Sequence, residues 1–193
     1  KFVRLLYKFS LKFPKKVFFL NNDDYELFIK YKIVSESKCI VLPGEGIETE
    51  YYRPLKKPER ETFKFLLIAR LLWDKGVGEY VEAAKIVKAY PEFKNVEFLL
   101  LGYIDEDNPS GIKKELINQW HSNNVIKYLG KVEDTREIIQ SADCVVLPSY
   151  REGVPRTLLE AASMEKPIIT SNSVGCKDVV EDNQREFYKK KIT

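Results

Sequence analysis

Two carboxylates, Glu152 and Glu160, lie eight positions apart in the segment Tyr150–Glu160, which is the part of the chain best suited to chemistry. This segment follows an apolar run, Asp143–Ser149, and leads into an apolar helical pattern that begins near Thr157. A strand-to-helix turn presents free backbone N–H groups and the positive end of a helix dipole, and both favour a bound anion. The segment therefore suits a ligand that offers a phosphate to the helix and hydroxyl groups to the carboxylates.

The same residues also admit a structural interpretation. Thr157 and Glu160 have the spacing of a capping box, in which the two side chains close the first turn of a helix. On this interpretation Glu160 binds no ligand. The pattern alone does not decide between the two.

Two cations, Arg70 and Lys75, follow a second apolar run, Phe63–Ala69. At the end of a parallel strand they could neutralise a diphosphate, arginine as a planar fork and lysine as a point charge. By themselves, an arginine and a lysine in a loop are usually just solvated. Residues 130–132 (Gly-Lys-Val) follow the run Val125–Leu129, and backbone groups there could contact the edge of a base. An ordinary turn is the alternative.

The elements that position these residues alternate regularly beyond residue 58. Strands are expected at Phe63–Ala69, Val96–Leu101, Val125–Leu129, Asp143–Pro148 and Pro167–Ser171. Helices are expected at Gly78–Tyr90, Ser110–Ser122, Thr135–Gln140, Thr157–Met164 and Cys176–Glu181. Apolar strands separated by helices predict an α/β domain, a doubly wound Rossmann-like parallel sheet that binds its ligands at the carboxyl ends of the strands.

The first part of the chain has its own short pattern. Strands are expected at Val17–Leu20 and Lys38–Leu42, with a helix at Asn21–Tyr31 begun by Asn and Asp caps. Residues 43–58 change character, with glycines, prolines and many charges but no apolar periodicity. We expect this stretch to be a linker or a functional loop.

Several function classes are excluded by what the sequence lacks. His121 is the only histidine and the three cysteines form no CxxC pair, so a histidine-based triad, a zinc site and a disulfide framework are not indicated. The Gly76-Val77-Gly78 run is faintly like a dinucleotide fingerprint, but Val81 occupies the place of the third small residue. No P-loop pattern occurs. We therefore expect neither a dehydrogenase nor a nucleoside triphosphatase.

Charge is concentrated at the N-terminal end. The net charge is +3, yet residues 1–16 hold six basic residues and no acidic one. Within Lys1–Phe13 the basic residues recur at helical spacing beside a broad aromatic and aliphatic face, which suits a helix lying in a membrane interface. Packing of that face against protein is the alternative. The pattern favours an anionic surface over nucleic acid as a partner, and without a signal peptide or a membrane-spanning run the cytoplasm is the expected compartment.

Four stretches, taken in this order and spacing, resemble one known family. They are Leu67–Gly76, Tyr128–Val132, Leu147–Pro155 and the closing Glu160. Together they resemble the family 4 retaining glycosyltransferases of the GT-B fold, over roughly residues 1–182. The Ala-Arg-x-Leu-Trp-x-Lys-Gly and Glu-Gly-Val-Pro forms look most like the bacterial hexosyl- and N-acetylhexosaminyltransferases that extend undecaprenyl-diphosphate-linked oligosaccharides.

The resemblance implies roles for individual residues. Arg70 and Lys75 would hold the donor diphosphate and offset charge on the leaving nucleotide, so they are predicted to be catalytic together with Glu152, which would bind hydroxyls of the transferred sugar. Glu160 would accept both ribose hydroxyls. The remaining predicted donor-binding residues, which act mainly through backbone groups, are Gly44, Lys131, Val132, Gly153, Val154, Arg156, Thr157 and Leu158.

The resemblance also implies the organisation and the partners. Residues 1–42 would be the last part of an acceptor-binding Rossmann-like domain, 43–58 the interdomain linker and 59–193 a truncated donor-binding domain. The co-substrate would be a nucleotide sugar, with UDP more expected than GDP, and the acceptor a lipid-linked saccharide at the cytoplasmic face of the bacterial inner membrane. Neither a metal nor another cofactor is expected.

Departures from the family pattern limit these expectations. Most of the acceptor domain is absent, the chain begins without Met, and residues 183–191 stand where the family continues into a Gly-x-Asn-Gly loop. We therefore expect an excised part of a longer protein that binds donor but is a poor transferase alone. A non-catalytic nucleotide-sugar-binding module remains the alternative.

Overall fold

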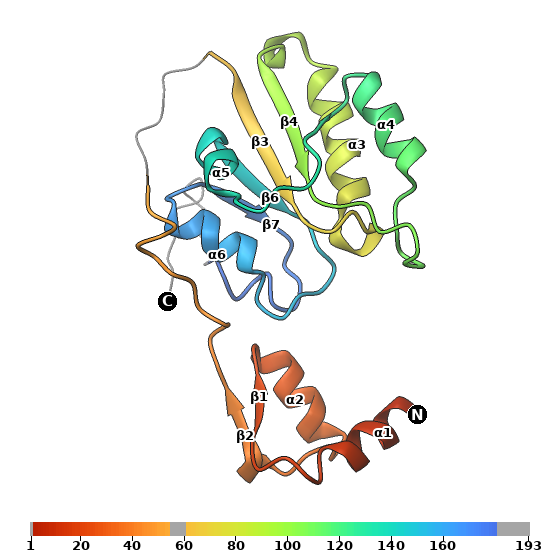
Figure 1. Ribbon diagram of the computed structural model, residues 1–193, viewed down its shortest axis with the longest axis vertical. Coiled ribbons are helices and arrows are strands. Elements are labelled where there is room, and N and C mark those ends of the chain that lie inside the picture. The colour runs from red at the N-terminus through yellow and green to blue at the C-terminus, as the bar shows by residue number, and fades with distance from the viewer. Residues whose placement is uncertain (1, 55–60, 181–193) are drawn as a thin grey trace.

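The computed structural model describes residues 2–54 and 61–180, which form two α/β bodies joined by the segment after β2 (Figure 1). The larger body holds a five-stranded sheet of β3 (Phe63–Ile68), β4 (Val96–Leu101), β5 (Lys127–Tyr128), β6 (Cys144–Leu147) and β7 (Ile168–Thr170). All of its strand pairs are parallel, in the order β5-β4-β3-β6-β7. The predicted α/β, doubly wound fold class is confirmed.

The strand order reverses beside β3, because the chain runs outward from β3 through β4 to β5 and then returns to place β6 on the other side of β3. In open parallel sheets this reversal opens a crevice outside the carboxyl ends of the strands, where ligands bind. In Figure 1 the arrow of β3 points toward the smaller body. Any ligand at the reversal therefore lies on the side that faces the other body.

Alternating side chains divide the core into two clusters. Leu66 and Ile68 point to one face and pack against α5 (Arg136–Ser141) and α6 (Arg156–Ser163). Leu67, between them, points to the other face and packs against the elements α3 (Val77–Lys88) and α4 (Lys114–Ser122). Figure 1 shows these helices on opposite sides of the sheet. Apolar residues on both faces explain why β3 reads as a continuous hydrophobic run.

The smaller body consists of α1 (Phe2–Ser10), β1 (Val17–Phe19), α2 (Asn22–Lys30) and β2 (Cys39–Val41), with β1 and β2 parallel. Asn21 caps α2, since its Oδ1 accepts from the Asp24 N–H at 2.8 Å. No residue of α1 is buried. Three short 3-10 helices complete the described elements, at Glu36–Lys38, Trp73–Lys75 and Pro91–Phe93.

Two predicted helices differ from the structure by more than two residues. Helix α4 begins at Lys114 rather than Ser110, because Gly111 forms a bridge with Leu72 and the Ile112 N–H donates to the Leu71 carbonyl at 3.0 Å. The described part of the expected helix at 176–181 forms turns instead. Its first residue is tied to the loop after β6, since the Cys176 thiol lies 4.0 Å from the Ser149 carbonyl oxygen, which also accepts from the nearby Ser173 hydroxyl at 2.7 Å.

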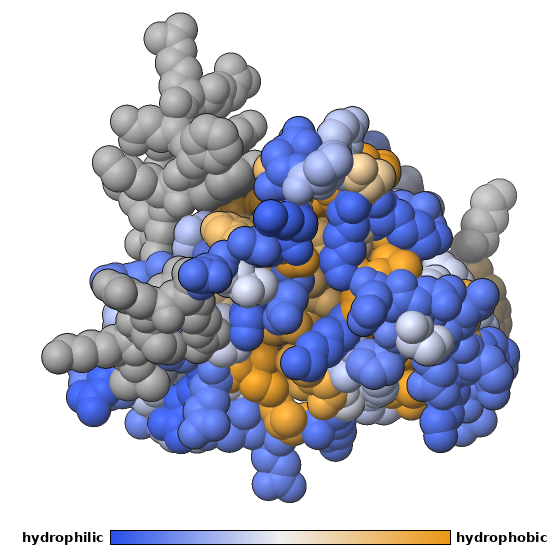
Figure 2. Space-filling view, turned by 90° about the horizontal axis from the view of Figure 1, so that it is seen from above, coloured by the Kyte–Doolittle hydropathy of each residue, from blue (hydrophilic) through white to orange (hydrophobic). Residues whose placement is uncertain are grey.

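The face at which β3 begins is mostly hydrophilic (Figure 2). Cys144 lies buried in β6, and burial raises the pKa of its thiol to about 12. The thiol is therefore protonated at neutral pH, and Cys144 packs as an apolar core residue. None of the helices within residues 2–54 and 61–180 is long and apolar enough to cross a membrane.

Candidate functional site

The loops that follow β3 and β6 are locked together at the strand-order reversal. Gly76 has a φ of 74°, and a Cβ atom built on it would lie 2.2 Å from the Pro148 carbonyl oxygen. From the β6 side, the Tyr150 N–H and the Ser149 hydroxyl both donate to the Asp74 carbonyl, at 3.0 and 3.3 Å. Only glycine tolerates this backbone and this approach. The two loops therefore present their side chains as one rigid surface.

An ion pair joins two of the predicted site residues across this surface. Lys75 Nζ lies 2.7 Å from Glu152 Oε1, and both side chains are mostly buried, with 16% of each exposed. Arg70 lies on the same edge of the sheet but is half-exposed, and its guanidinium is 3.7 Å from the Asp105 carboxylate. The sequence pattern predicted both cations and Glu152, but not that each cation has a carboxylate partner.

Backbone contacts fix the loop that carries Glu152, which we call the 151–154 loop (Arg151–Val154). The Glu152 N–H donates to the Val174 carbonyl at 2.9 Å. Gly175, with a φ of 82°, leaves no room for a Cβ atom, which would lie 2.4 Å from the Glu152 carbonyl oxygen and 2.3 Å from that of Gly153. The predicted site residues Glu152 and Gly153 are thus held by the segment after β7.

Glu160 is a buried carboxylate rather than part of a capping box. Helix α6 begins at Arg156 after the N-cap Pro155, and no side chain caps it. Thr157 therefore lies inside the first turn, so the capping-box interpretation is wrong. Glu160 is 5% exposed, and it accepts from the Thr135 hydroxyl at 3.3 Å and from Arg156 Nε at 3.1 Å.

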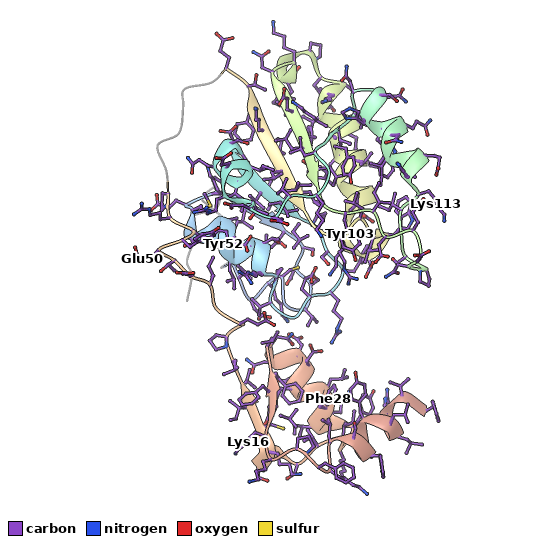
Figure 3. All side chains as sticks on the ribbon, viewed as in Figure 1. Lys16, Phe28, Glu50, Tyr52, Tyr103 and Lys113 are labelled. Atoms are coloured by element: carbon purple, nitrogen blue, oxygen red, sulfur yellow. The ribbon has the colours of Figure 1, made fainter. Side chains whose placement is uncertain are left out.

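Two neighbours of Glu160 were not predicted. Thr135 lies just before α5, and Tyr52 comes from the linker, where the sequence showed no apolar periodicity. Tyr52 packs into the core beside α6 (Figure 3), and the Ser163 hydroxyl donates to its carbonyl at 2.5 Å. Burial and the Glu160 carboxylate together raise the pKa of the Tyr52 phenol.

Further predicted residues gather around the start of α6. Gly44 lies beside Val154, since a Cβ atom on Gly44 would be 3.1 Å from Val154 Cγ1. The Leu158 side chain is fully buried and its N–H donates to the Pro155 carbonyl at 3.0 Å, so a ligand would have to compete for that group. Val154 and Leu159 also line a cavity of about 330 Å³ between the two bodies.

The segment after β5 reaches the same region. Gly130 accepts a hydrogen bond at its carbonyl from the Gly102 N–H at 2.8 Å, which ties the ends of β5 and β4 together. Lys131 is exposed, with its Nζ 5.9 Å from the centroid of the Tyr103 ring. Val132 is half-buried against the core cluster that includes α6. The chain then continues to Thr135, which contacts Glu160.

The arrangement combines cations, buried carboxylates and the amino end of a helix at one sheet edge. Such a set can hold an anionic group and a neighbouring polyhydroxyl group at the same time. Among the described residues, no group of three or more His, Cys, Asp or Glu side chains is placed to hold a metal ion.

Comparison with known sequences identifies related proteins. Residues 62–191 match the model of the family described as Glycosyl transferases group 1. The chain is 33% identical over 192 residues to the N,N'-diacetylbacillosaminyl-diphospho-undecaprenol alpha-1,3-N-acetylgalactosaminyltransferase of Campylobacter jejuni, with 93% of this chain and 48% of that protein covered. It is 30% identical over 196 residues to the UDP-Gal:alpha-D-GlcNAc-diphosphoundecaprenol alpha-1,3-galactosyltransferase of Escherichia coli, with 94% and 50% covered. The chain thus spans about half the length of the curated relatives it matches.

Solved structures share the fold over a similar length. A glycosyltransferase from Rickettsia africae ESF-5 superposes with a TM-score of 0.74 at 24% identity, covering 95% of this chain and 51% of that one. Anabaena Alr3699/HepE in complex with UDP and glucose superposes with a TM-score of 0.75 at 18% identity, covering 93% and 50%. At these identities the likeness shows the fold alone, which is that of GT-B enzymes.

Proposed function

Because the chain belongs to the glycosyl transferases group 1 family, we propose that it holds the nucleotide-sugar donor of a retaining, family 4 hexosyl- or N-acetylhexosaminyltransferase. The observation that carries this proposal is the buried Glu160 carboxylate beside the start of α6, on the same sheet edge as the Lys75–Glu152 pair. A buried carboxylate is unfavourable unless something compensates it. In this structure Arg156 and the Thr135 hydroxyl already donate to Glu160, and ribose hydroxyls that donate to the same carboxylate would add to these contacts.

The cations and the helix would divide the work on the donor diphosphate. Arg70 and Lys75 would offset the negative charge that develops on the leaving nucleotide, an electrostatic stabilisation that usually dominates such transfers. The N–H groups of Arg156 and Thr157 in the first turn of α6 would meet phosphate oxygens, aided by the helix dipole. No metal is needed in this scheme, because fixed cations supply the positive charge.

The sugar and the base would occupy neighbouring positions. Glu152, fixed by Lys75 at 2.7 Å, would accept hydroxyl hydrogens of the transferred sugar, with backbone groups of Gly153 and Val154 beside it. The backbone of Lys131 and Val132 would contact the base. We propose UDP as the nucleotide, which is supported by the UDP-linked donor in the name of the E. coli relative.

The acceptor in this proposal is a lipid-linked saccharide in bacterial glycan biosynthesis. The undecaprenol-linked acceptors in the names of the Campylobacter and E. coli relatives support it. These relatives are transferases, so a non-catalytic binding module is not favoured. Since the chain matches only about half of each relative, we propose that it turns over poorly on its own.

We further propose that the basic N-terminal segment makes peripheral contact with the cytoplasmic face of the membrane that carries such an acceptor. Lys1 lies outside the described residues, but α1 exposes Phe2, Leu5 and Phe9 to solvent by 72%, 64% and 65%. Exposed aromatic and aliphatic side chains next to basic ones suit an interfacial helix.

Calorimetric titration with UDP and then GDP tests the donor site. We expect saturable UDP binding that Glu160→Ala and Arg70→Ala each weaken about tenfold, about 1.4 kcal/mol. Glu137→Ala is the matched control, because Glu137 is an exposed carboxylate on the neighbouring helix α5. Absence of UDP binding up to several millimolar, or equal losses in the control, would contradict the proposed site.

A further inference from the structure

We propose that Asn21, which belongs to the smaller body, is a positioning residue for the 151–154 loop of the larger body. This inference rests on the proposed function, because it concerns how the nucleotide-sugar site is held in shape. Asn21 is 3% exposed, although it is polar and lies between the two bodies. Its side chain is fully engaged.

Each half of the Asn21 amide has a separate task. The Oδ1 atom accepts from the Asp24 N–H at 2.8 Å and so caps α2. The Nδ2 atom donates to the Gly153 carbonyl oxygen at 2.9 Å and to Asp24 Oδ2 at 3.0 Å. A helix cap needs only the oxygen, and Ser or Asp would supply it equally well. The NH₂ group is what reaches the other body.

Holding the Gly153 carbonyl determines where the next N–H points. A trans peptide is planar, so the C=O of Gly153 and the N–H of Val154 point in opposite directions across one rigid unit. With the carbonyl fixed toward Asn21, the Val154 N–H is directed away from the smaller body's α2. Val154 is one of the residues proposed to meet donor oxygens. Asn21 therefore orients a ligand-facing group that it does not touch.

Other contacts bring the same two segments together. A Cβ atom on Gly153 would lie 3.0 Å from Leu20 Cδ1, so the loop packs closely against the residue before Asn21. Arg151 of the loop pairs with Asp24, and Lys177, in the segment after β7, pairs with Asp23 at 2.9 Å. These ion pairs are largely exposed and contribute little individually. The buried Asn21 hydrogen bond is the directional one.

Hydrogen–deuterium exchange on Asn21→Ser and Asn21→Ala tests the inference. Ser retains a capping oxygen but has no group that reaches Gly153, whereas Ala loses both functions. We expect the Glu152 amide to exchange about fivefold to tenfold faster in both variants, the effect of one lost hydrogen bond. The α2 amides should exchange faster only in Asn21→Ala. Asp23→Asn, which removes only the charge of the Lys177 pair, should leave the Glu152 amide unchanged.

A binding measurement separates this inference from the proposed function. With UDP-N-acetylgalactosamine as the probe, Asn21→Ser should lower affinity about fivefold, and with UDP alone by less, because the 151–154 loop faces the sugar. Unchanged exchange at Glu152, or faster exchange with unchanged affinity for the probe, would overturn the positioning role. If the unaltered chain binds neither probe, the proposed function fails, and the exchange result still decides whether Asn21 holds the loop.

Discussion

At the residue scale, the site is a set of charges that are already paired with one another. Lys75 contacts Glu152 at 2.7 Å and Arg70 lies 3.7 Å from Asp105. Pairing Lys75 lowers the net charge near the proposed diphosphate position. It also fixes the Glu152 carboxylate in one direction, which a residue that reads sugar hydroxyls requires. The ion pair therefore both orients the Glu152 carboxylate and lowers the net positive charge of the site.

Substitutions at Lys75 and Glu152 should reveal this coupling. Lys75→Met or Glu152→Gln alone leaves one mostly buried charge without its partner, so each should lower the free energy of unfolding by about 1–3 kcal/mol, between the values for exposed and buried pairs. The double variant should lose about 1–2 kcal/mol less than the sum of the singles. Urea unfolding of the four proteins measures the coupling. Additive losses would show that the pair contributes nothing.

Residue types, spacing and the family resemblance singled out four candidate side chains but not their surroundings. Arg70, Lys75, Glu152 and Glu160 were proposed from strand-end positions and from the family resemblance, and the structure has the first three in the loops after β3 and β6 and Glu160 in the helix that follows. Their roles remain proposals. The contact between Glu160 and Thr135 joins residues 25 positions apart in the sequence, and no local sequence pattern predicts a contact over such a separation.

At the element scale, the decisive feature is the contact between two loops. Strand β3 and strand β6 are neighbours in the sheet, and their following loops meet where the strand order reverses. Gly76 allows that meeting, since the Pro148 carbonyl oxygen occupies the space of its missing side chain. The close approach also aligns Lys75, one residue earlier, with Glu152.

Replacing Gly76 should therefore lower the free energy of unfolding much more than replacing another glycine of similar backbone conformation. In Gly76→Ala the positive φ costs about 1–2 kcal/mol, and the 2.2 Å approach adds a backbone shift of about 1–3 kcal/mol. Gly130 is the matched control, because it has a φ of 76° and nothing lies within 4 Å of its Cβ position. Gly130→Ala should lose only the free energy that the positive φ costs. Equal unfolding midpoints in urea for the two variants would contradict this account.

Element types were predictable where one local signal dominated. The strand Val96–Leu101 was predicted with its observed ends, because it lies between Asn95 and Gly102, two residue types that favour turns. At α6 the error was local, because the helix begins directly after Pro155, one residue earlier than the Thr157 pattern suggested. At α4 a distant contact overrode the local pattern, because the bridge between Leu72 and Gly111 keeps that segment out of the helix.

At the scale of the whole molecule, the two bodies differ in how well they bury their apolar surface. The five-stranded sheet is covered on both faces. The smaller body has only two strands, and α1 buries none of its residues. Phe18 of β1 is also 58% exposed. An apolar surface of this kind on a single chain usually marks an interaction site.

The proposed membrane contact predicts that the chain binds vesicles that contain anionic lipid more tightly than neutral ones. Apolar residues of α1 would enter the interface, and each nearby basic residue would add about 1 kcal/mol. Lys8→Gln with Lys12→Gln should weaken binding about tenfold or more in a sedimentation assay. Arg4 is left unchanged because its guanidinium stacks on the Tyr31 ring, 3.4 Å from the centroid.

The matched control removes two lysine charges from the larger body instead. Lys113 and Lys127 are exposed and belong to the larger body, and Figure 3 shows Lys113 far from α1. Neutralising both should leave vesicle binding unchanged if the contact runs through α1. Equal weakening by the two pairs would indicate a general charge effect, and no binding of the unaltered chain would retire the membrane contact. In that case the exposed face of α1 is better explained by packing against protein.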